Sequence, residues 1–538
     1  VQWMETIPGG PGYRIRKVRY EALPGMWIPA LLYEPEKLEG RVPVVLNVNG
    51  HDRPQGKAAD YKQTRCINQA RRGMLALNVE WLGMGQLHTK DYGHYRMNQL
   101  NLCGTSGLAP FYLSMSRGID LLLEHPHADP ERVAVAGLSG GGWQTIFISA
   151  LDTRVTLSDP VAGYSSNLTR TRHFSDLGDS EQTPCDMSLI TDYVQLTALR
   201  APRPTLLTFN ATDNCCFAAG HALPPLLAAS RPIFELYGKR GNLWAHINFT
   251  PGNHNFGRDN REVLYRMLGR HFFPGQKDFS AREIDCTTEL KTKQQLHVTI
   301  PDNNADFHSL STSLAKQLPR NPGIPAAGTA RSRWQVTARK RLKEVLRTPR
   351  YSATASRVGQ QQAGDTRAIR WKLQINGEWT VPVVELVRGT PRQTTILVAE
   401  KGRATASETS ESLLRAGHRV LAVDPFYYGE SRIGSRDFLF ALLVSTVGDR
   451  PLGLQARQLG AVARWSQQQH KQTPSLVAIG PRASLGALVA TGLEPDSITG
   501  LSLYGSLTSL KQIISDNKGV NEAPELFCFG LLETFDIP

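Results

Sequence analysis

Residues 1–275 alternate short β-rich runs with longer helical stretches, and this alternation constrains the fold more than any other feature of the chain. It predicts strands at residues 13–20, 27–33, 44–48, 74–79, 133–136, 155–158, 205–209 and 246–249. The first two flank a Pro-Gly turn and should be antiparallel, whereas the later ones are separated by crossover lengths and should be parallel. A closing helix is expected at 260–273. The pattern predicts an α/β fold in which an eight-stranded, mostly parallel sheet carries helices on both faces.

One glycine-rich segment carries a candidate nucleophile. Gly137-Leu138-Ser139-Gly140-Gly141 directly follows the β-run at 133–136 and precedes a helical stretch at 143–150. A serine on such a strand–turn–helix junction occupies a strained turn, and the flanking glycines let strand and helix pass without a side-chain clash. The context favours Ser139 as a catalytic nucleophile over a structural glycine-rich turn.

A serine hydroxyl needs a base to take its proton and an acid to orient that base. Asp213 follows the strand predicted at 205–209, and His254 follows the one at 246–249. Both therefore lie at the carboxyl ends of parallel strands, where the sites of open α/β sheets gather. Asp213 is also placed to cap a helix, and His254 is also typical of a plain loop histidine. Asp159 remains an alternative acid, and His221 and His246 remain alternative bases.

A tetrahedral intermediate requires two backbone donors. The N–H of Gly140, next to the nucleophile, is one candidate, and the N–H of His51, in the loop after the third predicted strand, is the other. The polar stretch 164–192 is the expected wall of the pocket, with the loop 86–95 as a second wall.

These motifs resemble the branch of the α/β-hydrolase superfamily that holds acetyl xylan esterases, dienelactone hydrolases and prolyl-oligopeptidase-type peptidases. The resemblance covers residues 10–275 in full and 370–538 in part. It implies an α/β-hydrolase fold, no cofactor, and a serine carboxylic-ester hydrolase that acts through an acyl-enzyme on a small-molecule or carbohydrate ester of the acetyl xylan type. A serine aminopeptidase or oligopeptidase is the alternative enzyme, and a non-catalytic binding protein is the alternative outside enzymology.

The second half of the chain repeats the order of the first. Runs at 379–385, 395–402, 419–424 and 475–480 match those at 27–33, 44–50, 74–80 and 133–137. We expect a tandem duplication with a catalytic domain at 1–275, a connector with a short strand (296–300) and a basic helix (331–350) at 276–365, and an incomplete α/β-hydrolase-like domain at 366–538. The strands that would bear an acid and a histidine are missing, which suggests a truncated copy.

The repeated half has lost its nucleophile. Arg482 stands where Ser139 stands in the first half, and Ser484 should lie inside the following helix. Because arginine cannot attack a carbonyl, we expect this domain to be a pseudo-hydrolase.

Charge and cysteine content add limits. The net charge is +13, but no nucleic-acid motif accompanies it, so we expect a basic surface without nucleic acid as a partner. No apolar run is long enough for a membrane span. The seven cysteines show neither a disulfide framework nor zinc spacing, and no metal is expected. The chain opens without methionine, which suggests either a fragment or an exported protein whose leader has been removed. The oligomeric state is open.

Overall fold

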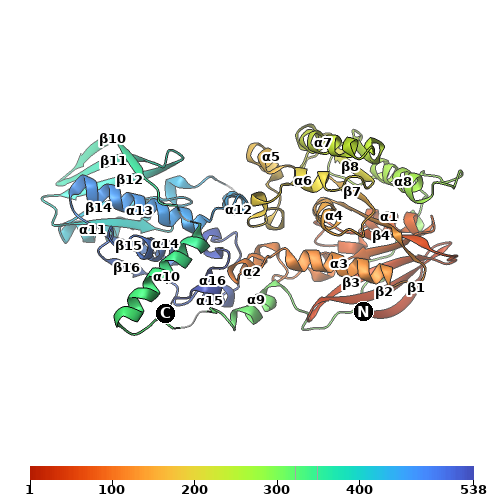
Figure 1. Ribbon diagram of the computed structural model, residues 1–538, viewed down its shortest axis with the longest axis horizontal. Helices are drawn as coiled ribbons and strands as arrows, with labels where there is room; N and C mark the ends of the chain where they lie inside the picture. Colours follow the sequence, from red (N-terminus) through yellow and green to blue (C-terminus); the bar gives the residue numbers. More distant parts are fainter. Residues whose placement is uncertain (321–322, 348, 435, 538) are drawn as a thin grey trace. The chain divides into compact units, whose positions relative to one another are not determined.

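The structure is a computed structural model that describes residues 1–320, 323–347, 349–434 and 436–537. The chain forms two compact units (Figure 1). The first unit comprises Val1–Met97, Gly107–Thr183 and Ile190–Leu310, and the second comprises Asn98–Ser106, Pro184–Leu189 and Ser311–Pro538. The segment 276–365, predicted as a connector, is therefore divided between the two units.

The first unit is built on a nine-stranded sheet with the order β1-β2-β3-β5-β4-β6-β7-β8-β9. The strands are β1 (Gln2–Pro8), β2 (Tyr13–Leu23), β3 (Met26–Pro35), β4 (Val42–Asn47), β5 (Leu75–Val79), β6 (Ala128–Leu138), β7 (Leu157–Val161), β8 (Thr205–Asn210) and β9 (Leu243–Asn248). The pairs β1–β2, β2–β3 and β3–β5 are antiparallel, and all later pairs are parallel. The mostly parallel α/β prediction is confirmed.

The predicted number of eight strands is wrong, because β1 was missed. This strand pairs only with β2, at the edge of the sheet, and most of its residues are exposed. An edge strand without a buried face lacks the alternation of apolar and polar residues by which strands are recognised.

Helices cover both faces of this sheet. They are α1 (Asp60–Ala70), α3 (Ala109–Leu123), α4 (Gly140–Leu151), α5 (Asn167–Arg172), α6 (Tyr193–Ala198), α7 (Ala219–Leu236) and α8 (Arg258–Phe272). Val45 of β4 belongs to the core cluster that includes Leu264 of α8. A methyl group of the next residue, Leu46, lies on the opposite side, close to Gly118 of α3. Neighbouring side chains of one strand thus face the two helical layers, as strand geometry requires.

The second unit holds a seven-stranded sheet with the order β10-β11-β12-β14-β13-β15-β16. The strands are β10 (Ala353–Ala363), β11 (Thr366–Ile375), β12 (Trp379–Arg388), β13 (Gln393–Ala399), β14 (His418–Val423), β15 (Ser475–Ile479) and β16 (Leu501–Tyr504). Its helices are α2 (Asn98–Leu102), α10 (Gly328–Leu346), α11 (Ser407–Arg415), α12 (Asp437–Thr446), α13 (Pro451–His470), α14 (Pro481–Leu493), α15 (Lys511–Ser515) and α16 (Leu531–Thr534). Helix α9 (Phe307–Ala315) spans the boundary between the units.

The four strands predicted from the repeated pattern all occur, as β12 to β15. The strand order of this sheet equals that of the first seven strands of the first sheet, with the same parallel and antiparallel pairs. After β16 the described residues, up to Ile537, contain short helices and no strand. A shared strand order does not by itself demonstrate common origin, so the duplication stays a prediction.

Two predictions for the connector were wrong. Residues 296–300 form no strand: Leu296 and Val298 are buried against Ile67 of α1, and this packing explains the alternating pattern without any ladder of hydrogen bonds. The polar stretch at 356–363 is instead part of β10, an exposed edge strand whose composition is that of a loop. The basic helix is confirmed as α10; of the predicted range, residue 348 lies outside the described residues.

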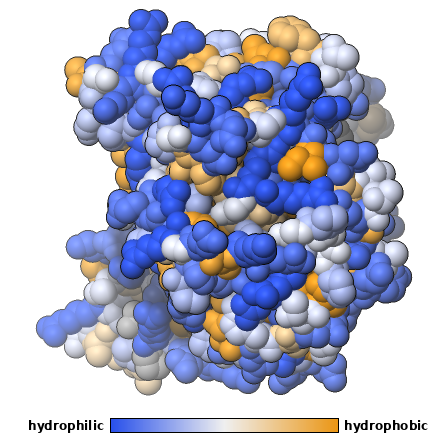
Figure 2. Space-filling view, turned by 90° about the vertical axis from the view of Figure 1, so that its right-hand side faces the viewer, coloured by the Kyte–Doolittle hydropathy of each residue, from blue (hydrophilic) through white to orange (hydrophobic). Residues whose placement is uncertain are grey.

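Among the described residues, no helix is long and apolar enough to cross a membrane. Figure 2 shows one face of the molecule, on which hydrophilic residues predominate and hydrophobic residues occur singly or in small groups. Scattered surface residues of this kind require no partner to explain them.

Candidate active site

Ser139 lies on the sharp turn between β6 and α4. Its backbone has φ of 62° and ψ of −123°, a conformation that a residue with a side chain rarely adopts. The turn is anchored because the Ser139 N–H donates to the carbonyl of Val161 at 2.9 Å. A Cβ on Gly137 would lie 2.7 Å from the carbonyl carbon of Gly141, so strand and helix pass too closely for side chains here. The strained turn expected around Ser139 is present.

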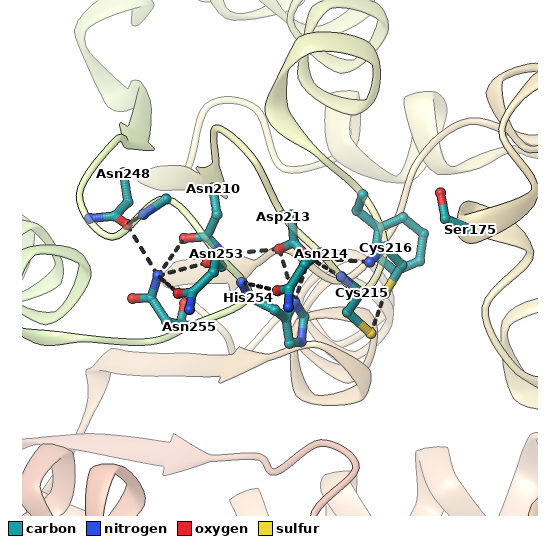
Figure 3. Close-up of polar contacts among 12 residues, drawn as sticks. Ser175, Asn210, Asp213, Asn214, Cys215, Cys216, Asn248, Asn253, His254 and Asn255 are labelled. Atoms are coloured by element: carbon teal, nitrogen blue, oxygen red, sulfur yellow. Dashed lines mark hydrogen bonds and ion pairs between the residues drawn. The ribbon is translucent and has the colours of Figure 1, made fainter.

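The loops after β8 and β9 bring Asp213 and His254 together (Figure 3). Nδ1 of His254 lies 2.9 Å from Oδ2 and 3.0 Å from Oδ1 of Asp213. The backbone N–H of His254 also donates to the side-chain oxygen of Asn214 at 3.0 Å. His254 is therefore held both by its ring and by its main chain.

Asp213 has enough donors around it to remain ionised. It accepts hydrogen bonds from the backbone N–H groups of Cys215 and Cys216, at 3.0 and 3.2 Å, and from Nδ2 of Asn210 at 3.1 Å. Burial alone raises the pKa of this carboxyl, but the hydrogen bond with His254, the charge of His254 and the other donors outweigh burial and lower it below its ordinary value. The converse holds for His254: burial lowers its pKa, but the hydrogen bond with Asp213 and the charge of Asp213 outweigh burial, so the net shift is upward.

The structure gives each alternative acid or base a different partner. Asp159 lies inside β7, is fully buried, and accepts a hydrogen bond from Thr208 at 2.7 Å. Nε2 of His221 lies 3.1 Å from the carboxylate of Asp176, and Nε2 of His246 lies 2.9 Å from that of Asp259. Of the predicted candidates, the structure joins Asp213 to His254.

The loop after β4 lies directly against the Ser139 turn. A Cβ on Gly50 would overlap the carbonyl oxygen of Leu138 and lie 3.0 Å from the backbone nitrogen of Gly140. As the first residue of α4, Gly140 has an N–H with no acceptor inside the helix. The neighbouring loop residue, His51, places its ring 4.6 Å from that of Trp81, and Trp81 in turn packs against the Cα of Gly140.

Acidic side chains gather around His51, although no sequence pattern predicts their contact with it. Asp179 and Glu181, from the stretch predicted as a pocket wall, lie 3.2 and 3.7 Å from Nε2 of His51, and they also approach His94. Burial lowers the pKa of His94, but the charge of Glu181 and the hydrogen bond with Asp179 outweigh it and raise the pKa well above the ordinary value. These residues come from three separate segments of the sequence, without a motif that would have revealed their meeting.

Asparagines behind the His254 loop were also missed. Nδ2 of Asn255 donates to the side-chain oxygens of Asn210 and Asn248, at 3.3 and 3.1 Å (Figure 3). These bonds tie the His254 loop to the ends of β8 and β9. The same figure shows Cys215 beside His254; its hydrogen bond with Cys216 lowers the pKa of the Cys215 thiol to about 6. The run Asn253-His254-Asn255 was the sequence signal for this network.

Comparison with known families finds one family model that matches the first unit. A model of the acetyl xylan esterase family matches residues 10–183, a stretch that includes the turn and the loop of Gly50. The first unit has the α/β-hydrolase fold. The protein is a hydrolase enzyme by the same match, and no curated protein matches the chain.

Solved structures similar to this hydrolase include "Methylesterase BT1017", with 20% identity over 59% of this chain and 68% of the other and a TM-score of 0.47. An acetyl xylan esterase from Paenibacillus sp. R4 has 16% identity over 50% and 88%, with a TM-score of 0.37. An acylaminoacyl peptidase from Pyrococcus horikoshii has 18% identity over 51% and 44%, with a TM-score of 0.38. The fold assignment rests on the sheet, the turn and the family match, and these distant similarities add nothing about the substrate.

The second unit of the hydrolase has no comparable turn. The backbone bond from Val48 to Ala136 corresponds to the one from Glu400 to Ile479, which aligns Ser139 with Arg482. However, the positive φ of 94° is at Gly480, so α14 begins two residues earlier and contains Arg482. Nη2 of Arg482 lies 3.1 Å from Oε2 of the buried Glu525, and Ser484 is buried within the helix as predicted.

Proposed function

We propose that the first unit is a serine carboxylic-ester hydrolase with Ser139 as nucleophile, His254 as base and Asp213 as the acid that orients it. The observation that carries this proposal is the pair formed by His254 and Asp213 on the loops after β8 and β9, in the same sheet whose strand β6 ends at the Ser139 turn. The chain order Ser, Asp, His is the order of this fold. A positive φ at Ser139 adds support, because backbone strain at a non-glycine residue concentrates at functional sites.

The tautomer of His254 follows from its partner. Since Nδ1 faces the carboxylate of Asp213, the neutral ring carries its proton on Nδ1 and leaves the lone pair on Nε2. In the proposed reaction Nε2 takes the proton of the Ser139 hydroxyl while Oγ attacks the ester carbonyl. The tetrahedral intermediate collapses when the C–O bond to the alcohol breaks and Nε2 returns the proton to the leaving oxygen. Water then attacks the acyl-enzyme, with His254 again acting first as base and then as acid, and the carboxylic acid is released.

The negative charge on the intermediate needs donors. We assign this role to the N–H groups of Gly140 and His51, because Gly140 begins α4 and the loop of His51 lies against it. The N-terminal end of α4 also carries the positive end of the helix dipole, which stabilises negative charge on the intermediate.

The proposed substrate is an acetylated or otherwise short-chain-esterified carbohydrate. Support comes from the match to the acetyl xylan esterase family and from the polar character of the stretch 164–192, which supplies Asp179 and Glu181 beside His51. Polar walls do not favour a long apolar acyl chain.

A substrate panel tests the proposal. Acetate release from acetylated xylan and cleavage of p-nitrophenyl acetate are expected, with p-nitrophenyl octanoate much slower. Faster hydrolysis of aminoacyl-nitroanilides than of acetyl esters would instead identify a peptidase. Binding of saccharides with no turnover in the wild type, equal to the behaviour of Ser139→Ala, would identify a non-catalytic binding protein.

The second unit is, in this proposal, a duplicated and non-catalytic copy within residues 366–538, while 1–275 is the catalytic domain. Besides the strand order, a local arrangement is repeated. In the first unit the backbone N–H of Lys57 donates to Glu80, which follows β5; in the second that of Arg403 donates to Asp424, which follows β14. Arg482 occupies the position that corresponds to Ser139, and its ion pair with Glu525 gives this position a structural role.

A further inference from the structure

Four potential metal ligands converge beside the Ser139 turn, all within the first unit. His51 comes from the loop after β4, His94 from the loop after β5, and Asp179 and Glu181 from the segment between α5 and α6. One ligand atom from each lies within 4.8 Å of the others. Oδ2 of Asp179 is 3.2 Å from Nε2 of His51 and 3.3 Å from Nδ1 of His94.

The ring of His94 presents a lone pair to this cluster. Its Nε2 lies 2.8 Å from the carbonyl oxygen of Leu82, which can only accept, so Nε2 carries a proton. In the neutral ring Nδ1 is then unprotonated and faces two carboxylates, Asp179 and Glu181. The two carboxylates need positive charge at this nitrogen, and either a second ring proton or a metal ion bound between the nitrogen and the oxygens supplies it. A histidine that donates its second N–H to a backbone carbonyl is also the usual arrangement of a metal ligand.

Glu181 supplies the second, independent observation. Its side chain is fully buried, and neither carboxylate oxygen accepts a hydrogen bond from any residue that the structure describes, although both histidine rings approach it. A buried carboxylate without donors is costly unless it is paired or binds a metal. With neutral rings the cluster has a formal charge of −2, which a divalent cation would balance.

The spacing suits a tetrahedral ion. Zinc bonds of about 2.0–2.2 Å to nitrogen and oxygen imply ligand–ligand edges of about 3.3–3.6 Å. Nε2 of His51 and Nδ1 of His94 lie 3.2 and 3.3 Å from Oδ2 of Asp179, and 3.7 and 3.0 Å from Oε1 and Oε2 of Glu181, respectively. Two imidazoles and two carboxylates form a donor set that zinc accepts. A cavity of about 340 Å³ has His94 and Asp179 in its wall and gives an ion a route to the cluster.

We propose that His51, His94, Asp179 and Glu181 bind one divalent transition-metal ion, zinc by preference. The ion would join three loops that share no regular hydrogen-bonded element. Trp81 packs edge-on against both histidine rings, with ring centroids 4.6 and 4.7 Å away, and contacts the Cα of Gly140. The four ligands are positioning residues in this proposal: they fix the loop of His51 and, through Trp81, the start of α4.

Metal content of the full chain provides the test. Protein dialysed against a chelator is titrated with zinc chloride, and bound zinc is measured by equilibrium dialysis and elemental analysis. One zinc per chain is expected, together with a rise in melting temperature. Cobalt(II) in its place should give the visible absorption of a tetrahedral site.

Two variants locate the ion. Glu181→Gln keeps the shape of the side chain and removes its charge; because changes even beyond the ligands cost about 10- to 100-fold in metal affinity, this one should cost at least about 100-fold. His221→Gln is the matched control, since His221 also faces a carboxylate in this unit but lies outside the cluster. Its zinc affinity should equal that of the wild type.

A third variant covers the competing group formed by Cys215, Cys216 and His254. Cys215→Ser should retain zinc. The proposal is overturned if the wild type binds no zinc, if Glu181→Gln binds it as tightly as the wild type, or if Cys215→Ser is the variant that loses it. If the wild type binds no zinc, protonated imidazoles alone balance the charge of the two carboxylates. None of these readouts depends on esterase activity, so they are independent of the proposed reaction.

Discussion

Nδ1 of His254 lies within 3.0 Å of both carboxylate oxygens of Asp213. A single ring nitrogen thus faces the whole carboxylate, which fixes the plane of the imidazole and directs Nε2 away from the acid. The Asp213→Asn change keeps the size of the side chain but lets an amide donor face Nδ1, which favours the wrong tautomer. We expect turnover of p-nitrophenyl acetate to fall about 10⁴-fold with the fold intact. A near-silent Asp213→Asn would show that the acid is elsewhere.

The pH dependence of kcat/KM should report His254. The neutral ring is the base, so activity should rise with pH through the pKa of His254, which lies above its ordinary value because Asp213 favours the charged form more than burial opposes it. Removing the carboxylate leaves burial, which lowers the pKa of His254, opposed only by the smaller charge effect of Cys215. The residual activity of Asp213→Asn should therefore rise at lower pH than that of the wild type. A shift in the opposite direction would contradict the assignment.

Ser139→Ala should lower ester turnover by at least about 10⁴-fold, because the members of a triad act together. A serine-directed phosphonate should label Ser139 in the wild type and leave this variant unlabelled, as measured by peptide mass spectrometry. Ser484, buried inside α14, is the internal control. Labelling of Ser484 in the intact protein would refute the assignment.

Whether Asp159 could be the catalytic acid in place of Asp213 can also be tested, through the pH dependence of protein stability. Burial raises its pKa to about 7, above the ordinary value of 3.8, so the folded state holds a proton that the unfolded state releases. Stability from this group is present below about pH 4 and is lost as the pH rises to about 7, by a few kcal/mol. Asp159→Asn should be more stable than the wild type above pH 7, with the difference vanishing near pH 4, while activity stays within a few-fold. Melting temperatures across this range, beside acetate release, check both parts.

In the second unit, Arg482→Ser should create no activity. Combined with Ser139→Ala it should remain inactive, because Arg482 lies inside α14 and no strand with an acid or histidine follows β16 among the described residues. It should also destabilise the protein by about 3 kcal/mol, because it leaves the buried Glu525 without its cation. The double change Arg482→Ser with Glu525→Gln should recover part of this loss. Unchanged melting of the single variant would show that the ion pair contributes nothing.

The sequence by itself determined where the parallel strands lie along the chain and which residues stand near their ends. Val133–Ala136 followed by glycines and Ser139 indicated the turn, because strand period and glycine are local signals. Asp213 and His254 could be placed because the carboxyl ends of parallel strands meet at one edge. The edge strands β1 and β10 could not be recognised, since neither has a fully buried face. Leu296 and Val298 were wrongly predicted as part of a strand, because an irregular segment that packs on the core can also bury every second residue.

Only the tertiary structure decided which side chains meet. The sequence predicted both Asp159 and Asp213 just after parallel strands. The structure decided between them, because the loops after β8 and β9 bring Asp213 to His254, whereas Asp159 lies buried inside β7. The gathering of His51, His94, Asp179 and Glu181 has no signal in the sequence, because their spacing depends on how three loops fold over one edge of the sheet. Local patterns specify elements and their ends; contacts between loops depend on the free energy of the whole packed unit.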